Sequence, residues 1–337
     1  MRLQKEKIED IDYLYASARL RCLERDLLNR EKMERMTEAK TMEDVAKVLA
    51  ESNYPELVPQ TLGEVEQMLS EARLAAFKLL DSMAPGPRLI DVFKVKFDYH
   101  NIKTILKGEQ GESGGYRELL SPCGRVPAAV LQDAMREGSY SDLPKPMRKA
   151  IEEARETLAR TADPQLTDCI LDIACYTEML AIAKETASAF LVGYVKLLID
   201  SINLRTAIRV KRMGKGFDFL RASLIEGGDI AVSRLYGDIT PDLLDAVYHG
   251  KELAEAAAIG AAVLRNEAGL ARVDLAADDA LTHYLQNAKY VAFGEQPLVA
   301  YMAAKENEIT AIRTIMSGRF AQLAPETIRE RLREAYV

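Results

Sequence analysis

A seven-residue segment that occurs three times at nearly constant spacing constrains the fold of this chain more than any other feature. The copies are Asn101–Lys107, Asn203–Arg209 and Asn307–Arg313, and each fits the pattern Asn-x-x-Thr-x-aliphatic-basic. Their first residues lie 102 and 104 positions apart, which is the length of an ordinary domain. The sequence therefore predicts three domains, at residues 1–112, 113–215 and 216–337.

Within each copy the asparagine and the threonine are three positions apart, so they share one face of a helix. Such polar side chains in a packed helix more often satisfy a neighbouring helix end than bind a ligand. We therefore interpret six residues as structural hallmarks of the domains: Asn101, Thr104, Asn203, Thr206, Asn307 and Thr310.

The surroundings of the repeat are also similar between copies. Asp98 and Asp200 precede the first two asparagines by three positions, but the third copy has Ala304 there, so its register is the least defined. Gly108, Gly214 and Gly318 follow the three copies, and we expect them to end the helices.

Apolar residues recur at helical spacing throughout, and sustained alternation typical of strands is missing. Near the amino end, one helical face carries Ile11, Leu14, Tyr15, Ala18 and Cys22. Helix starts are predicted at Thr61, with Glu64 completing a capping box, and at Asp163-Pro164 and Thr240-Pro241. Glycine and proline total only 31 of 337 residues, which favours long helices, so the predicted fold class is all-α.

Charge and hydropathy argue against nucleic-acid binding and against a membrane-spanning helix. With 45 basic and 52 acidic residues the net charge is −7, which disfavours nucleic acid. The longest apolar run, Ala256–Leu264, has nine residues, about half of what a membrane span needs. The amino end lacks the apolar core of a signal peptide, so we expect a cytoplasmic protein.

Motifs for catalysis, cofactors and metals are missing. Gly214-Lys215-Gly216 lacks the Ser or Thr of a phosphate-binding loop, and the four cysteines form no CxxC pair. Asp279 and His283 are spaced to hold a metal on one helical face, although an exposed ion pair is the better interpretation. We expect no catalytic, cofactor or metal site.

One basic cluster stands out, because five basic residues occur over eleven positions without an acid: Arg205, Arg209, Lys211, Arg212 and Lys215. Two interpretations remain open. The cluster is either a solvated helix end, or a contact with an acidic partner or lipid headgroups.

Four segments together resemble a known family: Tyr13–Arg21, Phe97–Lys103, Asp200–Arg209 and Lys305–Ile309. They are similar, in the expected order, to the C subunit of the bacterial and archaeal V/A-type ATP synthases, whose counterpart in the eukaryotic V-ATPase is the d subunit. Ala304 and the shifted third copy are the departures.

The resemblance implies three similar helical domains around a pseudo-threefold axis, shaped as a funnel. It implies a non-catalytic rotor subunit without a cofactor, peripheral to the cytoplasmic face of the cell membrane. Members of the family cap the ring of proteolipid subunits and receive the D and F subunits of the central stalk, transmitting torque for ATP-coupled proton or sodium transport. Membrane contact is then indirect, through the ring. The alternative is an all-helical repeat adaptor with an unrelated partner. A helical-bundle enzyme is disfavoured.

Overall fold

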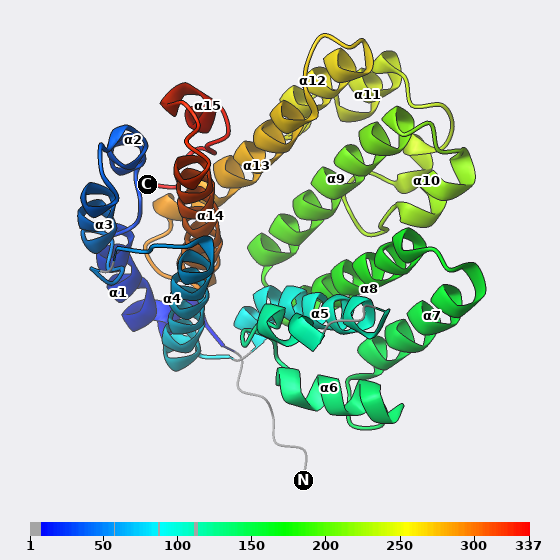
Figure 1. Ribbon diagram of the computed structural model, residues 1–337, viewed down its shortest axis with the longest axis horizontal. Helices are drawn as coiled ribbons and strands as arrows, with labels where there is room; N and C mark the ends of the chain where they lie inside the picture. The colour runs from blue at the N-terminus through cyan, green and yellow to red at the C-terminus, as the bar shows by residue number, and fades with distance from the viewer. Residues whose placement is uncertain (1–7, 57, 87, 111–113) are drawn as a thin grey trace. The chain divides into compact units, whose positions relative to one another are not determined.

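A computed structural model of the chain describes residues 8–56, 58–86, 88–110 and 114–337 (Figure 1). In this part of the chain every regular element is a helix, which confirms the predicted all-α class. None of these described helices combines the length and the apolar composition that crossing a membrane requires.

The chain divides into two compact units. The terminal unit comprises residues 1–90 and 278–337, and the central unit comprises residues 91–277. The two boundaries fall within helices α5 (Arg88–Gln110) and α13 (Leu270–Gln286). The predicted boundaries of three repeat domains and their pseudo-threefold arrangement stay predictions.

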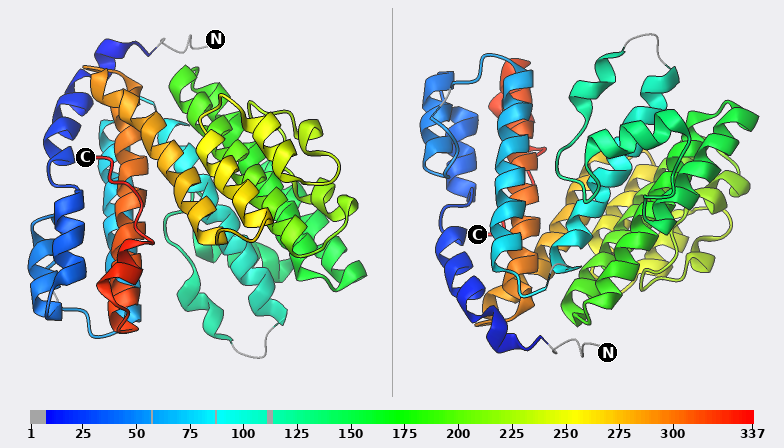
Figure 2. Two further views of the ribbon diagram at one scale, coloured as in Figure 1. Left: turned by 90° about the horizontal axis from the view of Figure 1, so that it is seen from above. Right: turned by 90° about the horizontal axis from the view of Figure 1, so that it is seen from below.

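The terminal unit is built around the long helix α14, which packs against α4, α1 and α2. Figure 2 shows α4 and α14 side by side in both views. Its elements besides parts of α5 and α13 are η1 (Asp10–Tyr13), α1 (Leu14–Glu24), α2 (Arg30–Glu38), α3 (Met42–Ala50), α4 (Leu62–Met83), η4 (Asn287–Tyr290), α14 (Glu295–Phe320) and α15 (Pro325–Arg329). Ile309, Ile312 and Ile315 of α14 are fully buried in one core with residues of α2, α3 and α4, so the two ends of the chain form a single core.

The central unit contains the first two copies of the repeated segment, in α5 and α9. Its remaining elements are η2 (Gly114–Leu119), α6 (Ala128–Glu137), α7 (Lys145–Thr161), α8 (Pro164–Glu185), α9 (Ala189–Arg212), α10 (Phe217–Ser223), η3 (Val232–Leu235), α11 (Pro241–Tyr248) and α12 (Ala254–Leu264). Helix α8 packs between α7 and α9, and α12 packs on α9 and α11.

The predicted helix starts are confirmed. Asp163 and Thr240 cap α8 and α11, and each is followed by proline at the first helical position. The Thr61 hydroxyl accepts from the Glu64 N–H at 3.2 Å at the start of α4. The capping box is not closed in the predicted way, because the Glu64 carboxylate accepts from Gln60 N–H instead of from Thr61.

Of the three glycines expected to end the repeat helices, only Gly214 does so, with a left-handed φ of +66°. Gly108 and Gly318 lie inside α5 and α14. Gly318 permits a close approach, since a Cβ there would lie 2.6 Å from the Ile328 side chain of α15. The glycine thus serves packing in the third copy and helix termination in the second.

The apolar face predicted near the amino end is on the outside of the molecule. Ile11, Leu14 and Tyr15 are 57%, 49% and 65% exposed. The buried side of η1 and α1 is formed by other residues, namely Tyr13, Ala16, Ser17, Leu20 and Glu24. The spacing did identify a common face, but that face does not pack on the core.

Candidate functional site

The first repeat copy holds the loop that follows its own helix. Asn101, fully buried on α5, makes two hydrogen bonds to the backbone of Ser121: its Nδ2 donates to the carbonyl at 2.9 Å, and its Oδ1 accepts from the N–H at 2.7 Å. One turn earlier, the Asp98 carboxylate accepts from Val126 N–H at 3.0 Å and from Arg125 Nε at 2.7 Å. Asparagine and aspartate together fix the loop 121–126.

The second copy repeats this geometry on α9. Asn203 Nδ2 donates to the Ile225 carbonyl and its Oδ1 accepts from the Ile225 N–H, both at 2.8 Å. Asp200 accepts from the backbone N–H groups of Asp229 and Ile230 at 2.9 and 3.2 Å. The residues bound by Asn and by Asp are five positions apart in both loops, 121 to 126 and 225 to 230. We call each arrangement a loop clamp.

Each clamp depends on a glycine that the repeat pattern did not reveal. A Cβ on Gly124 would lie 2.5 Å from Asp98 Oδ1, and one on Gly228 would lie 1.9 Å from Asp200 Oδ1. The carboxylate therefore occupies the space of a side chain. The signal in the sequence was a glycine 26 or 28 positions after the aspartate.

The two clamps differ in charge compensation. Arg125 pairs with Asp98 and, through Nη2 at 2.9 Å, with the buried Glu178 of α8. Burial raises the pKa of Asp98, and Arg125 opposes that rise. Burial raises the pKa of Asp200 to about 6, opposed mainly by the two backbone N–H donors. Backbone N–H dipoles thus stabilise the ionised carboxylate in the second clamp, whereas the Arg125 guanidinium does so in the first.

The third copy departs from the clamp. Asn307 Nδ2 donates to Thr282 Oγ1 at 3.0 Å, on the helix that precedes it. Ala304 supplies no carboxylate, but the buried Glu308 accepts from Leu28 N–H at 2.6 Å and from Tyr54 Oη at 2.7 Å, and pairs with Lys305. Glu308 therefore holds the connection between α1 and α2 to α14.

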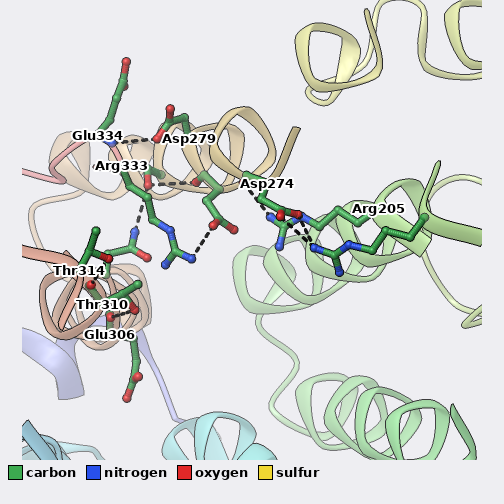
Figure 3. Close-up of polar contacts among 12 residues, drawn as sticks. Arg205, Asp274, Asp279, Glu306, Thr310, Thr314, Arg333 and Glu334 are labelled. Carbon is green, nitrogen blue, oxygen red and sulfur yellow. Dashed lines mark hydrogen bonds and ion pairs between the residues drawn. The ribbon is translucent and has the colours of Figure 1, made fainter. Parts of the chain in front are cut away.

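The threonines of the repeat do not share partners with the asparagines. Thr104 and Thr206 are half-buried, and Thr310 Oγ1 donates to the Glu306 carbonyl of its own helix at 2.9 Å (Figure 3). In the part of the chain that the structure describes, each of the three asparagines binds protein groups. That the six residues mark three domains stays a prediction.

The basic cluster separates into two parts. Arg209 Nη2 binds both carboxylate oxygens of Asp274 at 2.8 Å, and Arg205 Nε lies 3.6 Å from the same carboxylate (Figure 3). Lys211 pairs with Asp238. Arg212 is exposed and has no acidic partner among the described residues, and Lys215 Nζ lies 5.1 Å from the Phe219 ring centroid. Of the five described residues of the cluster, Arg212 and Lys215 are the two whose charge the fold leaves uncompensated.

A hollow of about 420 Å³ lies at the end of α9, and Arg212 but not Lys215 is in its lining. Lys211 and Arg212 line it together with Ile239, Pro241 and Leu264. Nearby, the exposed rings of Phe217 and Tyr236 meet edge to face, with their centroids 5.6 Å apart, and Met213 is 51% exposed. Apolar surface next to unpaired positive charge is suited to binding a protein with acidic side chains.

Asp279 and His283, which are spaced to hold a metal, instead bind the carboxyl-terminal segment. Asp279 accepts from Glu334 N–H and His283 Nε2 binds the Glu334 carboxylate at 2.7 Å, so the two residues are joined through the carboxyl-terminal segment. Within the described residues no group of three or more His, Cys, Asp and Glu side chains is placed to hold a metal ion. The cysteines are free thiols, and burial raises the pKa of Cys175 to about 12, far from a reactive thiolate.

Comparison with known proteins places this architecture in one family. The family model described as ATP synthase (C/AC39) subunit matches residues 16–331. The C subunit of the V-type sodium ATPase of Enterococcus hirae is 23% identical, over 97% of this chain and 99% of that protein. The C subunit of the A-type ATP synthase of Halobacterium salinarum is 26% identical, over 95% and 97% respectively. The C subunit of the A-type ATP synthase of Thermococcus kodakarensis is 22% identical, over 94% of this chain and 89% of that protein. Because the family model covers nearly the whole chain, the resemblance seen in the sequence is confirmed: the protein belongs to the ATP synthase (C/AC39) subunit family.

Proposed function

We propose that this chain is a non-catalytic rotor subunit of a V/A-type ATP synthase. It caps the proteolipid ring on the cytoplasmic side of the membrane and receives the D and F subunits of the central stalk. It thereby transmits torque for ATP-coupled proton or sodium transport. The observation that carries the proposal is the family match across residues 16–331, together with relatives aligned along nearly their full length.

The construction of the described helices supports a mechanical role. A torque-bearing part must resist shear, and here buried side chains tie loops to helices by paired hydrogen bonds. Asn203, for example, fixes both backbone groups of Ile225, and Glu308 joins Leu28 and Tyr54 to α14. Such bonds between segments distant in sequence hold the connections in place as well as the helices.

Copurification from membranes tests the proposal. A tagged chain extracted in mild detergent should come out with the proteolipid ring and with the D and F subunits. Recovery with an unrelated protein, and with neither ring nor stalk, would instead support the helical adaptor. Protease protection of inside-out and right-side-out vesicles tests the cytoplasmic location, because only the former should expose the chain.

The charge that remains unpaired at the end of α9 is our candidate contact with a partner. Replacing Arg212 and Lys215 together by Glu should weaken assembly more at low salt than at high salt, because unpaired surface charges are screened. Arg160→Glu is the matched control, since Arg160 is also an exposed basic residue in the last turn of a helix, α7. Unchanged assembly of the double variant removes this surface from the interface.

A further inference from the structure

Three large apolar side chains are exposed near the junction of α9 and α10. Met213, Phe217 and Tyr236 are 51%, 43% and 40% exposed. The rings of Phe217 and Tyr236 pack edge to face, with their centroids 5.6 Å apart, and Met213 follows the last residue of α9. Exposed apolar surface that gathers in one place on a folded protein marks a site of interaction.

The hollow at the end of α9 adjoins these side chains. Arg212, in its lining, directly precedes Met213, and Ile239, also in its lining, follows Tyr236 by three positions. Figure 1 shows α10, α11 and α12 close to this end of α9. The apolar part of the lining consists of Ile239, Pro241, Val263 and Leu264. A hollow of about 420 Å³ with such a lining can take a large apolar side chain of a partner.

Contacts within the central unit hold this region in a fixed arrangement. Lys211 pairs with Asp238 and thereby ties the end of α9 to the segment that carries Tyr236. Lys215 Nζ lies 5.1 Å from the Phe219 ring centroid, which keeps this cation beside α10. A surface that is organised before its partner arrives loses less conformational entropy on association.

The segments that form this region carry an excess of positive charge. These segments are residues 205–223, 234–242 and 264–267. They contain eight basic and four acidic residues, and the acidic ones include Asp218 and Asp242, which have no cationic partner among the described residues. Asp274 of α13 adds a fifth carboxylate, because it pairs with Arg205 and Arg209. Three positive charges therefore remain in excess.

We define the α9-end surface as Arg212, Met213, Lys215, Phe217 and Tyr236. We propose that it binds an acidic segment of another subunit, an assignment that rests on the proposed function. A large apolar side chain of that segment enters the hollow, and the Asp or Glu residues beside it pair with Arg212 and Lys215. The rings of Phe217 and Tyr236 cover the contact from the side and exclude water from it.

Two other modes of binding fit this surface less well. A partner strand would need a free sheet edge, and every regular element in the part of the chain that the structure describes is a helix. A bilayer also attracts basic residues, but its polar headgroups would meet the apolar lining of the hollow. A protein segment satisfies both the positive charge and the apolar hollow.

Photo-crosslinking in native membranes tests the assignment. The probe is benzoylphenylalanine in place of Met213, in the full chain and the assembled complex. We expect a crosslink, located by mass spectrometry, to a segment of a different subunit that carries Asp or Glu beside a large apolar residue. The same probe in place of Leu119, which is 66% exposed in the central unit, is the control and should not reach that segment.

The outcomes separate the two proposals. If the chain copurifies with ring and stalk but the Met213 probe reaches only lipid, its own chain, a second copy or nothing, the docking assignment is wrong and the proposed function stands. If the chain copurifies with neither, the proposed function fails and the docking assignment fails with it.

Truncating one exposed ring tests the apolar part of the contact. Phe217→Ser in the probe-carrying chain should lower the Met213 crosslink yield roughly fivefold. Leu119→Ser is the matched control, because Leu119 is also an exposed apolar residue of the central unit. Thermal unfolding of both variants verifies that they remain folded. Equal yields in the two variants would contradict an apolar contact at Phe217.

Removing one charge tests the acidic part of the partner. Arg212→Ala in the probe-carrying chain should lower the Met213 crosslink yield roughly fivefold at low salt, and less at high salt. Arg160→Ala, at an exposed position in the last turn of α7, is the matched control. An unchanged yield with Arg212→Ala would exclude an acidic partner at this surface.

Discussion

The first two copies of the repeated segment and the third place the same asparagine in different structural roles. Asn101 and Asn203 each bind both backbone groups of one residue in the loop that follows their helix. Asn307 makes one side-chain hydrogen bond to Thr282 of the preceding helix. The difference follows from the neighbouring positions, since Asp98 and Asp200 complete a loop clamp, whereas Ala304 cannot. A repeated motif can thus keep its place on the helix while its partners change.

Glu308 offers the largest test of this comparison, because it takes over in the third copy what the aspartates do in the first two. Glu308→Ala would leave Lys305, whose side chain is 12% exposed, without its carboxylate and would free Leu28 N–H and Tyr54 Oη. We expect a loss of about 3–5 kcal/mol in the free energy of unfolding, measured by urea denaturation. Glu306→Ala, in the same helix but with a side chain that is 30% exposed, should cost clearly less, because the Glu306 carboxylate is not fully desolvated. Equal losses would contradict the special role of Glu308.

The asparagines should differ in a graded way. Asn203→Ala removes two hydrogen bonds and leaves the buried backbone groups of Ile225 unsatisfied, at a cost of about 3 kcal/mol. Asn307→Ala removes one bond to a hydroxyl and should cost about 1 kcal/mol. Hydrogen exchange gives a local measurement: only the first variant should lose protection at residues 225–230. Loss of that protection in both variants would mean that the clamp is not local.

The two clamps should also differ in their response to pH. The folded-state pKa of Asp200 is about 6, above its ordinary value of 3.8, so the folded protein binds more protons between these values. The free energy of unfolding therefore falls as pH rises from about 4 to about 6, by at most about 3 kcal/mol from this group.

Subtracting the unfolding curve of Asp200→Asn from that of the unmodified protein isolates this dependence. Asp98→Asn should show a smaller one, because Arg125 offsets part of the rise in the Asp98 pKa. A flat difference curve for Asp200 would contradict a raised pKa of the carboxylate in the second clamp.

The smallest expected effect concerns the basic residues of α9. Arg209→Ala breaks an exposed pair with Asp274 and should cost no more than about 1 kcal/mol of stability. Arg212→Ala should leave stability unchanged, since Arg212 has no acidic partner among the described residues. Thermal unfolding of the two variants measures this, and a larger loss for Arg212 would mean that its charge supports the fold.

The sequence predicted the asparagines of the site. It did not predict the glycines and the acidic partner that contact the repeat helices, because these contacts form only in the folded protein. The repeat identified Asn101, Asn203 and Asn307, because similar helices need similar polar anchors. It did not reveal Gly124 or Gly228, since their requirement arises only when a carboxylate from another segment fills the Cβ position. Nor did the basic cluster reveal that Asp274, 65 positions after Arg209, neutralises part of it.

The sequence by itself determined the helical class, the helix starts at Thr61, Asp163 and Thr240, and the family, because these depend on local periodicity, capping and short motifs. Only the tertiary structure decided which faces are buried. Helices η1 and α1 carry a regular apolar face, yet Tyr13, Ala16 and Leu20 pack inside while Ile11, Leu14 and Tyr15 remain outside. Periodicity defines a face, but the elements that pack against a helix determine which face meets the core.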